Sequence, residues 1–187
     1  ITYDVNVICP DGVTPEFYAV NKIDNGKVVK GDELVFENGI VKVPENISVI
    51  TWVCDSATSG TAAVGVNAEL NLKQVTFYTE TQFGTADTAG EIKVTDSNGV
   101  TTTVGANQKA LLATGDGYSY IATPSGNFSD FWNAVTLTEQ TVSGEATVVL
   151  SYTLKSKKTI TVPKEAQVDV YYQTKNYAGE HVTPVHI

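Results

Sequence analysis

Short segments in which apolar and polar residues alternate, separated by Asn-Gly and Asp-Gly turns, run through most of this chain of 187 residues. The first segment, residues 2–9, places Tyr3, Val5, Val7 and Cys9 on one face and stops at Pro-Asp-Gly. A period of two is that of a β-strand with one buried face. Asn-Gly dipeptides supply the positive φ angles that tight hairpins need. The pattern therefore predicts an all-β chain with very little helix.

Two hairpins and one central strand are the clearest local predictions. The hairpins turn at Asn38-Gly39 and at Asn98-Gly99, each between alternating segments. Residues 48–54 carry apolar side chains on both faces, which is typical of a strand covered on both sides. Beyond residue 64, about seven strands follow at short spacing, as in an Ig-like antiparallel β-sandwich.

The chain is predicted to contain two β modules. Residues 57–63 are small and polar and lack periodicity, which is typical of a linker. They would join an N-terminal small β module at 1–56 to a β-sandwich module at 64–187. Residues 43–52 and 162–171 each read as a strand ending at Val-Pro, an acidic corner and a strand ending in an aromatic residue. This arrangement resembles that of Ig-like repeats, and the resemblance implies two modules of related design.

One segment has the spacing of a helix. Phe128, Phe131, Trp132 and Val135 fall at positions i, i+3, i+4 and i+7. The spacing predicts a short helix over 128–134 that closes an open end of the sandwich.

The charge of the chain excludes some partners. Its 12 cationic residues are all lysine, they face 21 acidic residues, and the net charge is -9. Without a basic footprint we expect no nucleic acid partner and no binding to an anionic membrane surface. The longest apolar runs are far shorter than the roughly 20 residues that cross a bilayer, so no membrane insertion is expected. The sequence starts at Ile1 and not at Met, which favours a mature or trimmed extracellular or cell-surface product.

The two cysteines, Cys9 and Cys54, both end alternating segments, and neither lies in a Cys-x-x-Cys context. That context would indicate zinc or redox chemistry. We therefore predict a Cys9–Cys54 disulfide, formed in an oxidising compartment, with two free buried thiols as the alternative.

Few residues of the chain suggest catalysis. The only histidines, His181 and His186, lie in the last seven residues, and no Gly-x-Ser-x-Gly segment is present. Residues 96–99 offer two oxygen ligands in a turn, fewer than a calcium loop supplies. The sequence therefore predicts a protein that is not an enzyme and has no metal or other cofactor. An internal amide crosslink made by a buried Lys73 stays open as a minor alternative.

Aromatic residues give the only positive indication of a binding site. Tyr118, Tyr120, Phe131 and Trp132 lie within fifteen residues of one another, and together they could form a platform on which a sugar ring stacks. The alternative is that these side chains fill the core of the sandwich.

Two functions remain from the sequence. The first is a non-enzymatic structural or adhesive surface protein, such as a subunit of a surface layer, a pilus-like filament or a virion decoration. It would act through self-association or a surface partner, and residues 2–9 could add as a strand to the open sheet edge of a neighbour. The alternative is a carbohydrate-binding module of a secreted enzyme or scaffold, with a glycan partner.

Overall fold

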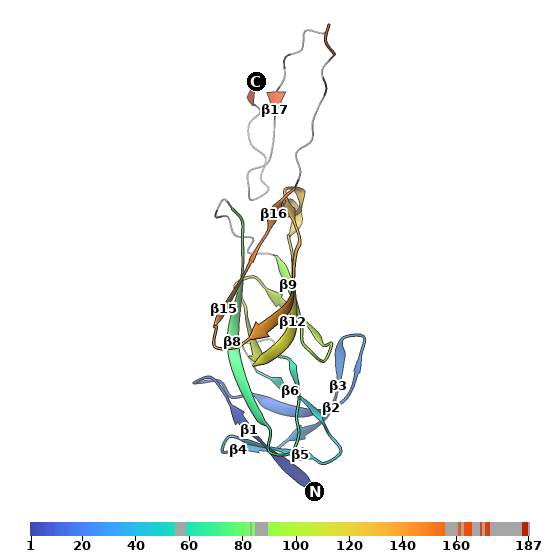
Figure 1. The fold of residues 1–187 in the computed structure, drawn as a ribbon, viewed down its shortest axis with the longest axis vertical. Helices are drawn as coiled ribbons and strands as arrows, with labels where there is room; N and C mark the ends of the chain where they lie inside the picture. Colours follow the sequence, from blue (N-terminus) through green and yellow to red (C-terminus); the bar gives the residue numbers. More distant parts are fainter. Residues whose placement is uncertain are drawn as a thin grey trace.

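The computed structural model describes residues 1–54, 59–82, 84, 90–155, 161, 163–165, 169, 171–172 and 185–186 (Figure 1). Strands make up almost all of its regular structure, which confirms the predicted all-β class. The strands are β1 (Thr2–Ile8), β2 (Glu16–Asp24), β3 (Lys27–Leu34), β4 (Phe36–Glu37), β5 (Ile40–Pro44), β6 (Val49–Val53), β7 (Thr61–Ala63), β8 (Glu69–Glu80), β9 (Glu91–Thr95), β10 (Thr101–Gly105), β11 (Lys109–Ala113), β12 (Gly115–Thr123), β13 (Trp132–Asn133), β14 (Val135–Val142), β15 (Thr147–Ser151), β16 (Thr153–Leu154), β17 (Tyr171–Tyr172) and β18 (Val185–His186).

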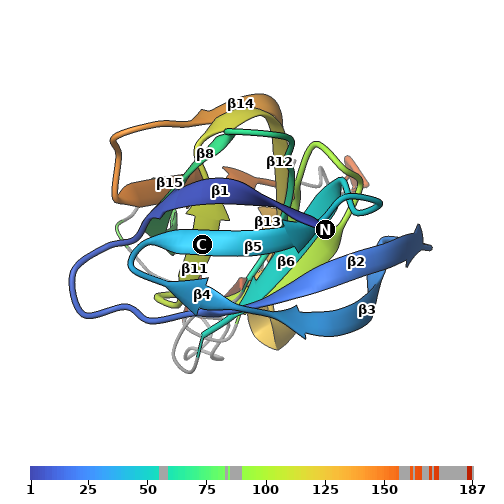
Figure 2. The same ribbon diagram turned by 90° about the horizontal axis from the view of Figure 1, so that it is seen from below.

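Three larger sheets form the body of the molecule. A six-stranded sheet has the order β11-β8-β1-β5-β4, with β15 also paired to β8. The other two are four-stranded, with the orders β3-β2-β6-β7 and β10-β9-β12-β14. Most pairings are antiparallel, as predicted, but β8 pairs in parallel with both β1 and β15. Figure 2 shows β1 lying beside β5, with the β2–β3 hairpin crossing below them.

Two hydrophobic cores lie between these sheets. The N-terminal core is built around the fully buried side chains of Val5, Phe17, Val41, Ile50 and Trp52. It lies between the six-stranded sheet and the β3-β2-β6-β7 sheet, which is the arrangement of a β-sandwich. The C-terminal core lies between the β10-β9-β12-β14 sheet and strands β8, β11 and β15, and it contains Phe77, Ile92, Tyr120, Trp132 and Leu150.

Strands β8 and β11 belong to both cores. Leu72 of β8 lies opposite Ala113 of β11, and both side chains join the N-terminal core. Val75 lies opposite Ala110, and this pair joins the C-terminal core. Because successive side chains of a strand point to opposite faces, the β8–β11 pair can serve one core with each face. The two sandwiches therefore share a wall, along which they are stacked in Figure 1.

The predicted hairpins are confirmed. Asn38 and Gly39 have φ values of 52° and 74° and connect β4 to β5. Residues 96–100 connect β9 to β10, and Gly99 has φ 81°. The predicted central position of this strand is confirmed, because β6 pairs with β2 on one edge and with β7 on the other. Its two faces are not equally covered, since Ile50 and Trp52 are fully buried while Val53 on the other face is 40% exposed.

The structure differs from the sequence prediction at two places. Residues 61–63 of the predicted linker form β7, which closes the β3-β2-β6-β7 sheet. In place of the predicted helix over 128–134, the 3-10 helix η1 (Gly126–Asp130) is followed by the short strand β13. Phe128 and Trp132 are both buried in the C-terminal core, which explains why the apolar residues of this segment have a helix-like spacing. The backbone at Trp132 is nevertheless extended, since β13 pairs with β16. The second Ig-like segment, 162–171, falls largely outside the described residues.

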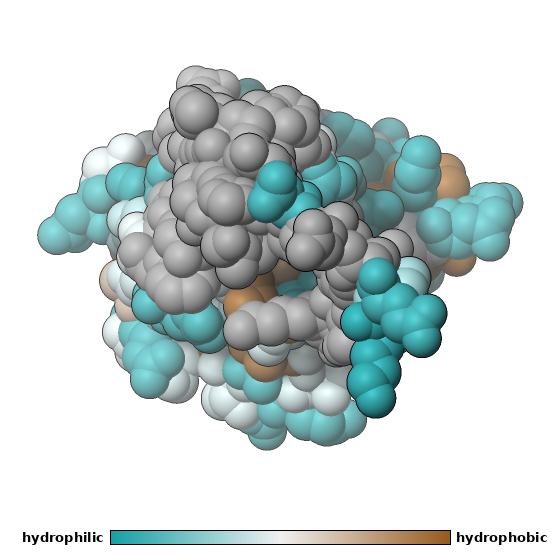
Figure 3. All heavy atoms as spheres, turned by 90° about the horizontal axis from the view of Figure 1, so that it is seen from above, coloured by the Kyte–Doolittle hydropathy of each residue, from teal (hydrophilic) through white to brown (hydrophobic). Residues whose placement is uncertain are grey.

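Within the described part of the chain, no helix combines the length and the apolarity needed to cross a membrane. Figure 3 views the end of the molecule that lies nearest the C-terminus, and hydrophilic residues dominate the described surface around its margin. That surface fits the acidic composition of the chain.

Candidate functional site

The aromatic group predicted from the sequence lies in the C-terminal core. Trp132 is 1% exposed, Tyr120 is 1% exposed and Tyr118 is 4% exposed, while Phe131 is partly buried against the same core. Burial raises the pKa of Tyr120 to about 12. Burial also raises the pKa of Tyr118, whose hydroxyl donates a hydrogen bond to the carbonyl of Ala113 at 2.7 Å. In this structure these four side chains do not form an exposed platform for a sugar ring.

The predicted Cys9–Cys54 disulfide is not present. Both cysteines are half-buried free thiols beside the N-terminal core. They lie close enough to interact, since Cys54 adds to the rise in the pKa of Cys9 that burial causes. Cys9 follows β1 of the six-stranded sheet, whereas Cys54 follows β6 of the opposite sheet. The packing of the two sheets brings the two thiols near one another, but no bond joins them.

The remaining residues that the sequence singled out are the two histidines and Lys73. His181 is outside the described residues, and only the backbone of His186 in β18 is described. Among the described residues, no group of three or more His, Cys, Asp or Glu could hold a metal ion. Lys73 is half-buried in β8, opposite Leu112 of β11.

The acidic turn at 96–99 joins the two sandwiches. Asp96 is 6% exposed, and one of its oxygens, Oδ1, accepts hydrogen bonds from the N–H groups of Asn98 (3.0 Å) and Val100 (3.1 Å) in its own turn. The other, Oδ2, accepts from the N–H of Thr61 (3.0 Å) and from its hydroxyl (2.6 Å), and Thr61 belongs to β7 of the N-terminal sandwich. Four donors satisfy the buried carboxylate, as burial of a charge requires. We call this contact the Asp96–Thr61 junction.

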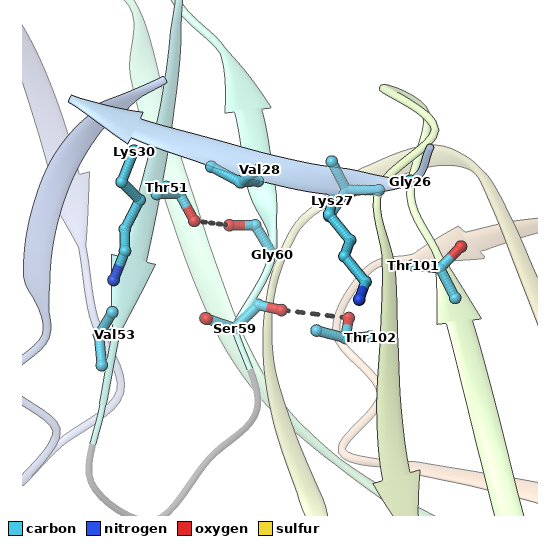
Figure 4. Close-up of a pocket in the computed structure, with 11 residues that line it drawn as sticks. Gly26, Lys27, Val28, Lys30, Thr51, Val53, Ser59, Gly60, Thr101 and Thr102 are labelled. Atoms are coloured by element: carbon cyan, nitrogen blue, oxygen red, sulfur yellow. Dashed lines mark hydrogen bonds between the residues drawn. The ribbon is translucent and has the colours of Figure 1, made fainter. Parts of the chain in front are cut away.

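A cleft of about 220 Å³ lies between the two sandwiches, next to this junction (Figure 4). One wall is β3 with Lys27, Val28 and Lys30, and the other is the start of β10 with Thr101 and Thr102. We call it the inter-module cleft. The β2–β3 hairpin reaches it because the turn of this hairpin contacts β10, where the N–H of Thr101 donates to the carbonyl of Gly26 at 2.9 Å.

The floor of the inter-module cleft is held from both sides. Thr51 of β6 donates its hydroxyl to the carbonyl of Gly60 at 2.8 Å, and Thr102 of β10 donates its hydroxyl to the carbonyl of Ser59 at 3.3 Å. Figure 4 shows these two bonds on opposite sides of the Ser59–Gly60 segment. A floor fixed in this way loses little conformational freedom when a ligand binds.

The described lining of the cleft is cationic in an acidic protein. It contains two lysines, Lys27 and Lys30, and no carboxylate among its described residues. In Figure 4 both lysine side chains extend from β3 toward the floor. The ion pairs found in the described part of the chain, Lys42 with Asp4 and Lys93 with Glu91, use neither of them.

Tyr18 of β2 supports Lys30. The ammonium nitrogen of Lys30 lies 4.7 Å from the centroid of the Tyr18 ring, within the range of a cation–π contact. The Tyr18 hydroxyl donates to a carboxylate oxygen of Glu16 at 2.9 Å, and this hydrogen bond is the main cause of its raised pKa. The ring thus holds the lysine at the rim of the cleft.

A larger hollow of about 410 Å³ lies on the edge of β8 that faces away from β11. On this edge β1 pairs with β8 as far as Asn71, and β15 begins to pair at Thr76. Neither strand pairs with residues 72–75, so this stretch of the edge is open within the described structure. We call it the open edge of β8.

Sequence reasoning missed both features. Residues of the inter-module cleft come from four separate stretches of chain between Gly26 and Thr102. An Asn25-Gly26 dipeptide in the sequence indicates a turn, but nothing in the sequence indicates that this turn contacts β10. Comparison with protein-family models, with curated proteins and with solved structures finds no match.

Proposed function

We propose that this chain is a non-enzymatic structural or adhesive protein of an extracellular or cell surface, and that it acts by contacts with copies of itself. The observation that carries this proposal is the open edge of β8. It lies between the pairings of β1 and β15, in the wall that both sandwiches share, and a strand of a second copy could add there. A shared wall is also suited to transmit load from one sandwich to the other, since β8 and β11 contribute side chains to both cores.

The direction of the backbone groups defines how a strand would add. The N–H of Thr76 donates to the carbonyl of Ala146 on this edge, at 2.8 Å. Backbone groups alternate in direction along a strand, so those of Gln74 point to the same side as Thr76. They lie between the β1 and β15 pairings, and they are the groups that an added strand would pair with. Strand β1, which the sequence suggested as the added segment, pairs with β5 and β8 in this structure and would have to leave both.

The sequence supports the absence of turnover in this proposal. No histidine occurs before residue 181, and no arginine is available to anchor an anionic transition state. An Ig-like strand order of the two sandwiches is part of the same proposal, based on their facing, largely antiparallel sheets.

Size-exclusion chromatography with light scattering, followed by electron microscopy, tests self-association over a range of protein concentrations. We expect oligomers or filaments that grow with concentration. Gln74→Pro removes the N–H that faces the open edge and should abolish them, while a near-native circular dichroism spectrum shows that the variant folds. A wild-type chain that stays monomeric throughout, or a folded Gln74→Pro variant that assembles normally, contradicts the proposal.

The carbohydrate-binding alternative now requires a different surface. Three of the four predicted aromatic residues are buried, so stacking on Trp132 does not support it. The inter-module cleft is the observation that favours this alternative.

A further inference from the structure

We propose that the inter-module cleft binds the carboxylate and neighbouring hydroxyls of an acidic sugar, such as a uronate residue of a polysaccharide. This inference is independent of self-association at the open edge of β8, because the cleft and the edge share no residue.

The charge of the cleft selects an anion. Lys27 and Lys30 extend toward its floor, and its described lining offers no carboxylate to neutralise them. Lys27 and Lys30 are the only charged residues in that described lining, which is therefore positive within a chain of net charge -9, although Asp24 lies opposite Lys27 in the β2–β3 pair. A positive lining favours an anionic ligand.

The hydroxyls of the cleft favour a hydroxylated anion over a bare one. The protons of the Thr51 and Thr102 hydroxyls are committed to the carbonyls of Gly60 and Ser59. The oxygens of these threonines therefore keep lone pairs that can accept hydrogen bonds from a ligand. Sugar hydroxyls donate such bonds, whereas fully ionised sulfate cannot.

The apolar residues of the lining are suited to contact the C–H faces of a sugar ring. Val28 and Val53 line the cleft, and Val53 is 40% exposed. A pyranose ring presents C–H groups on its faces, and apolar side chains can cover them. Lysine, a point charge on a flexible stem, can meet a carboxylate without the fixed forked geometry that arginine uses for phosphate.

The shape of the cleft depends on an irregularity in β2. The register of the β2–β3 pair shifts between Val20 and Lys22, so that Lys22 lies opposite Val29 and Val20 lies opposite Lys30. Such bulges increase the local twist of a hairpin. We attribute to this twist the way in which β3 lies over the cleft and directs both lysines toward it.

Titration of the 15N-labelled full chain with trigalacturonic acid, followed by amide chemical shifts, tests the inference. We expect the shifts to concentrate on the amides of Val28, Ser59 and Thr102, and binding to weaken as salt is added. Galactotriose, the neutral counterpart, should produce no comparable shifts. Shifts centred elsewhere, or equal binding of the neutral sugar, overturn the proposal.

Charge variants provide the matched comparison. Lys27→Gln with Lys30→Gln should lower the affinity for trigalacturonic acid at least about tenfold, through loss of two charge-assisted contacts. Lys22→Gln with Lys155→Gln changes the net charge by the same amount at exposed lysines outside the cleft, and should lower it less than about twofold. Equal losses for the two double variants refute a specific site.

Two further probes decide the ligand class. Sodium sulfate tests for a simple anion site, and a short polyglutamate peptide tests for an acidic protein partner. We expect neither to match trigalacturonic acid at equal ionic strength. If either probe binds the cleft as tightly as trigalacturonic acid or more tightly, the assignment to an acidic sugar is wrong.

Discussion

Replacement of Asp96 by asparagine should destabilise both sandwiches, because this carboxylate bonds to each of them. Asparagine has almost the same shape, but one carboxylate oxygen becomes an NH₂ group. The NH₂ group replaces one of the two oxygens, and each oxygen accepts two of the four hydrogen bonds from Asn98, Val100 and Thr61. Two hydrogen bonds are therefore lost in either orientation of the amide, because the NH₂ group then faces two other donor groups. Hydrogen bonds to a charged group contribute about 1.5 to 3 kcal/mol each, so we expect the loss of two to cost about 3 to 6 kcal/mol.

A second variant measures how much of this decrease in the free energy of unfolding comes from the Asp96–Thr61 junction. Thr61→Val removes the hydroxyl, which donates to Asp96 at 2.6 Å, but leaves the backbone N–H in place. It should cost about 1 to 2 kcal/mol. In the double variant the two losses should not add, since both variants change the same contact between the Asp96 carboxylate and the Thr61 hydroxyl. Asp116→Asn is the control: Asp116 is exposed and accepts only the Thr141 hydroxyl among the bonds found, so its loss should be within about 0.5 kcal/mol.

Tryptophan fluorescence can follow each core in urea. Trp52 lies in the N-terminal core and Trp132 in the C-terminal core, so Trp132→Phe and Trp52→Phe backgrounds report one core each. Asp96→Asn should lower the unfolding midpoint in both backgrounds. If only the C-terminal reporter moves, Asp96 stabilises its own turn and not the junction. A loss no larger than that of Asp116→Asn, or additive losses with Thr61→Val, refutes the reasoning altogether.

Three further predictions concern buried side chains. Trp132→Ala should cost about 3 to 5 kcal/mol in urea unfolding because it empties part of the core, and an unchanged stability would show that Trp132 is not packed there. Since the pKa of Tyr120 is raised from 10.0 to about 12, its contribution to stability is complete below pH 10 and is lost as pH rises toward 12. Thermal melts across that range should show the decline, and Tyr120→Phe should reduce it. Two thiols should react with Ellman's reagent in the unfolded protein without prior reduction, and a protein without reactive thiols would contradict the structure. In the folded protein Cys9 should react slowly, because its pKa is raised.

Local features of this protein follow from the sequence because they depend on neighbouring residues. Alternation identifies strands, since the side chains of a strand point to two faces in turn. Asn38-Gly39 and Asn98-Gly99 produce hairpins because glycine and asparagine accept positive φ at little cost. The all-β class and the position of β6 inside its sheet required nothing beyond these patterns.

The candidate site could not be predicted in the same way. The sequence singled out Trp132 and its aromatic neighbours, but composition does not tell whether a ring faces solvent or a core. The inter-module cleft depends on the contact between the turn at Gly26 and β10, which are far apart in the chain. The disulfide prediction failed although the two thiols lie near one another, because the sequence does not show whether Cys9 and Cys54 are placed to form a bond.

Alternation in the sequence predicts most of the strands and the apolar face of each, apart from β7 and β13. Which sheet covers that face depends on how the strands assemble in the folded chain. Leu72 and Val75 lie three residues apart on one strand, and both are apolar, yet they enter different cores. The reason is that period two assigns a side chain to one of two faces but carries no information about what covers each face. That choice depends on the closure of the whole chain, which places one sandwich on each side of the β8–β11 wall.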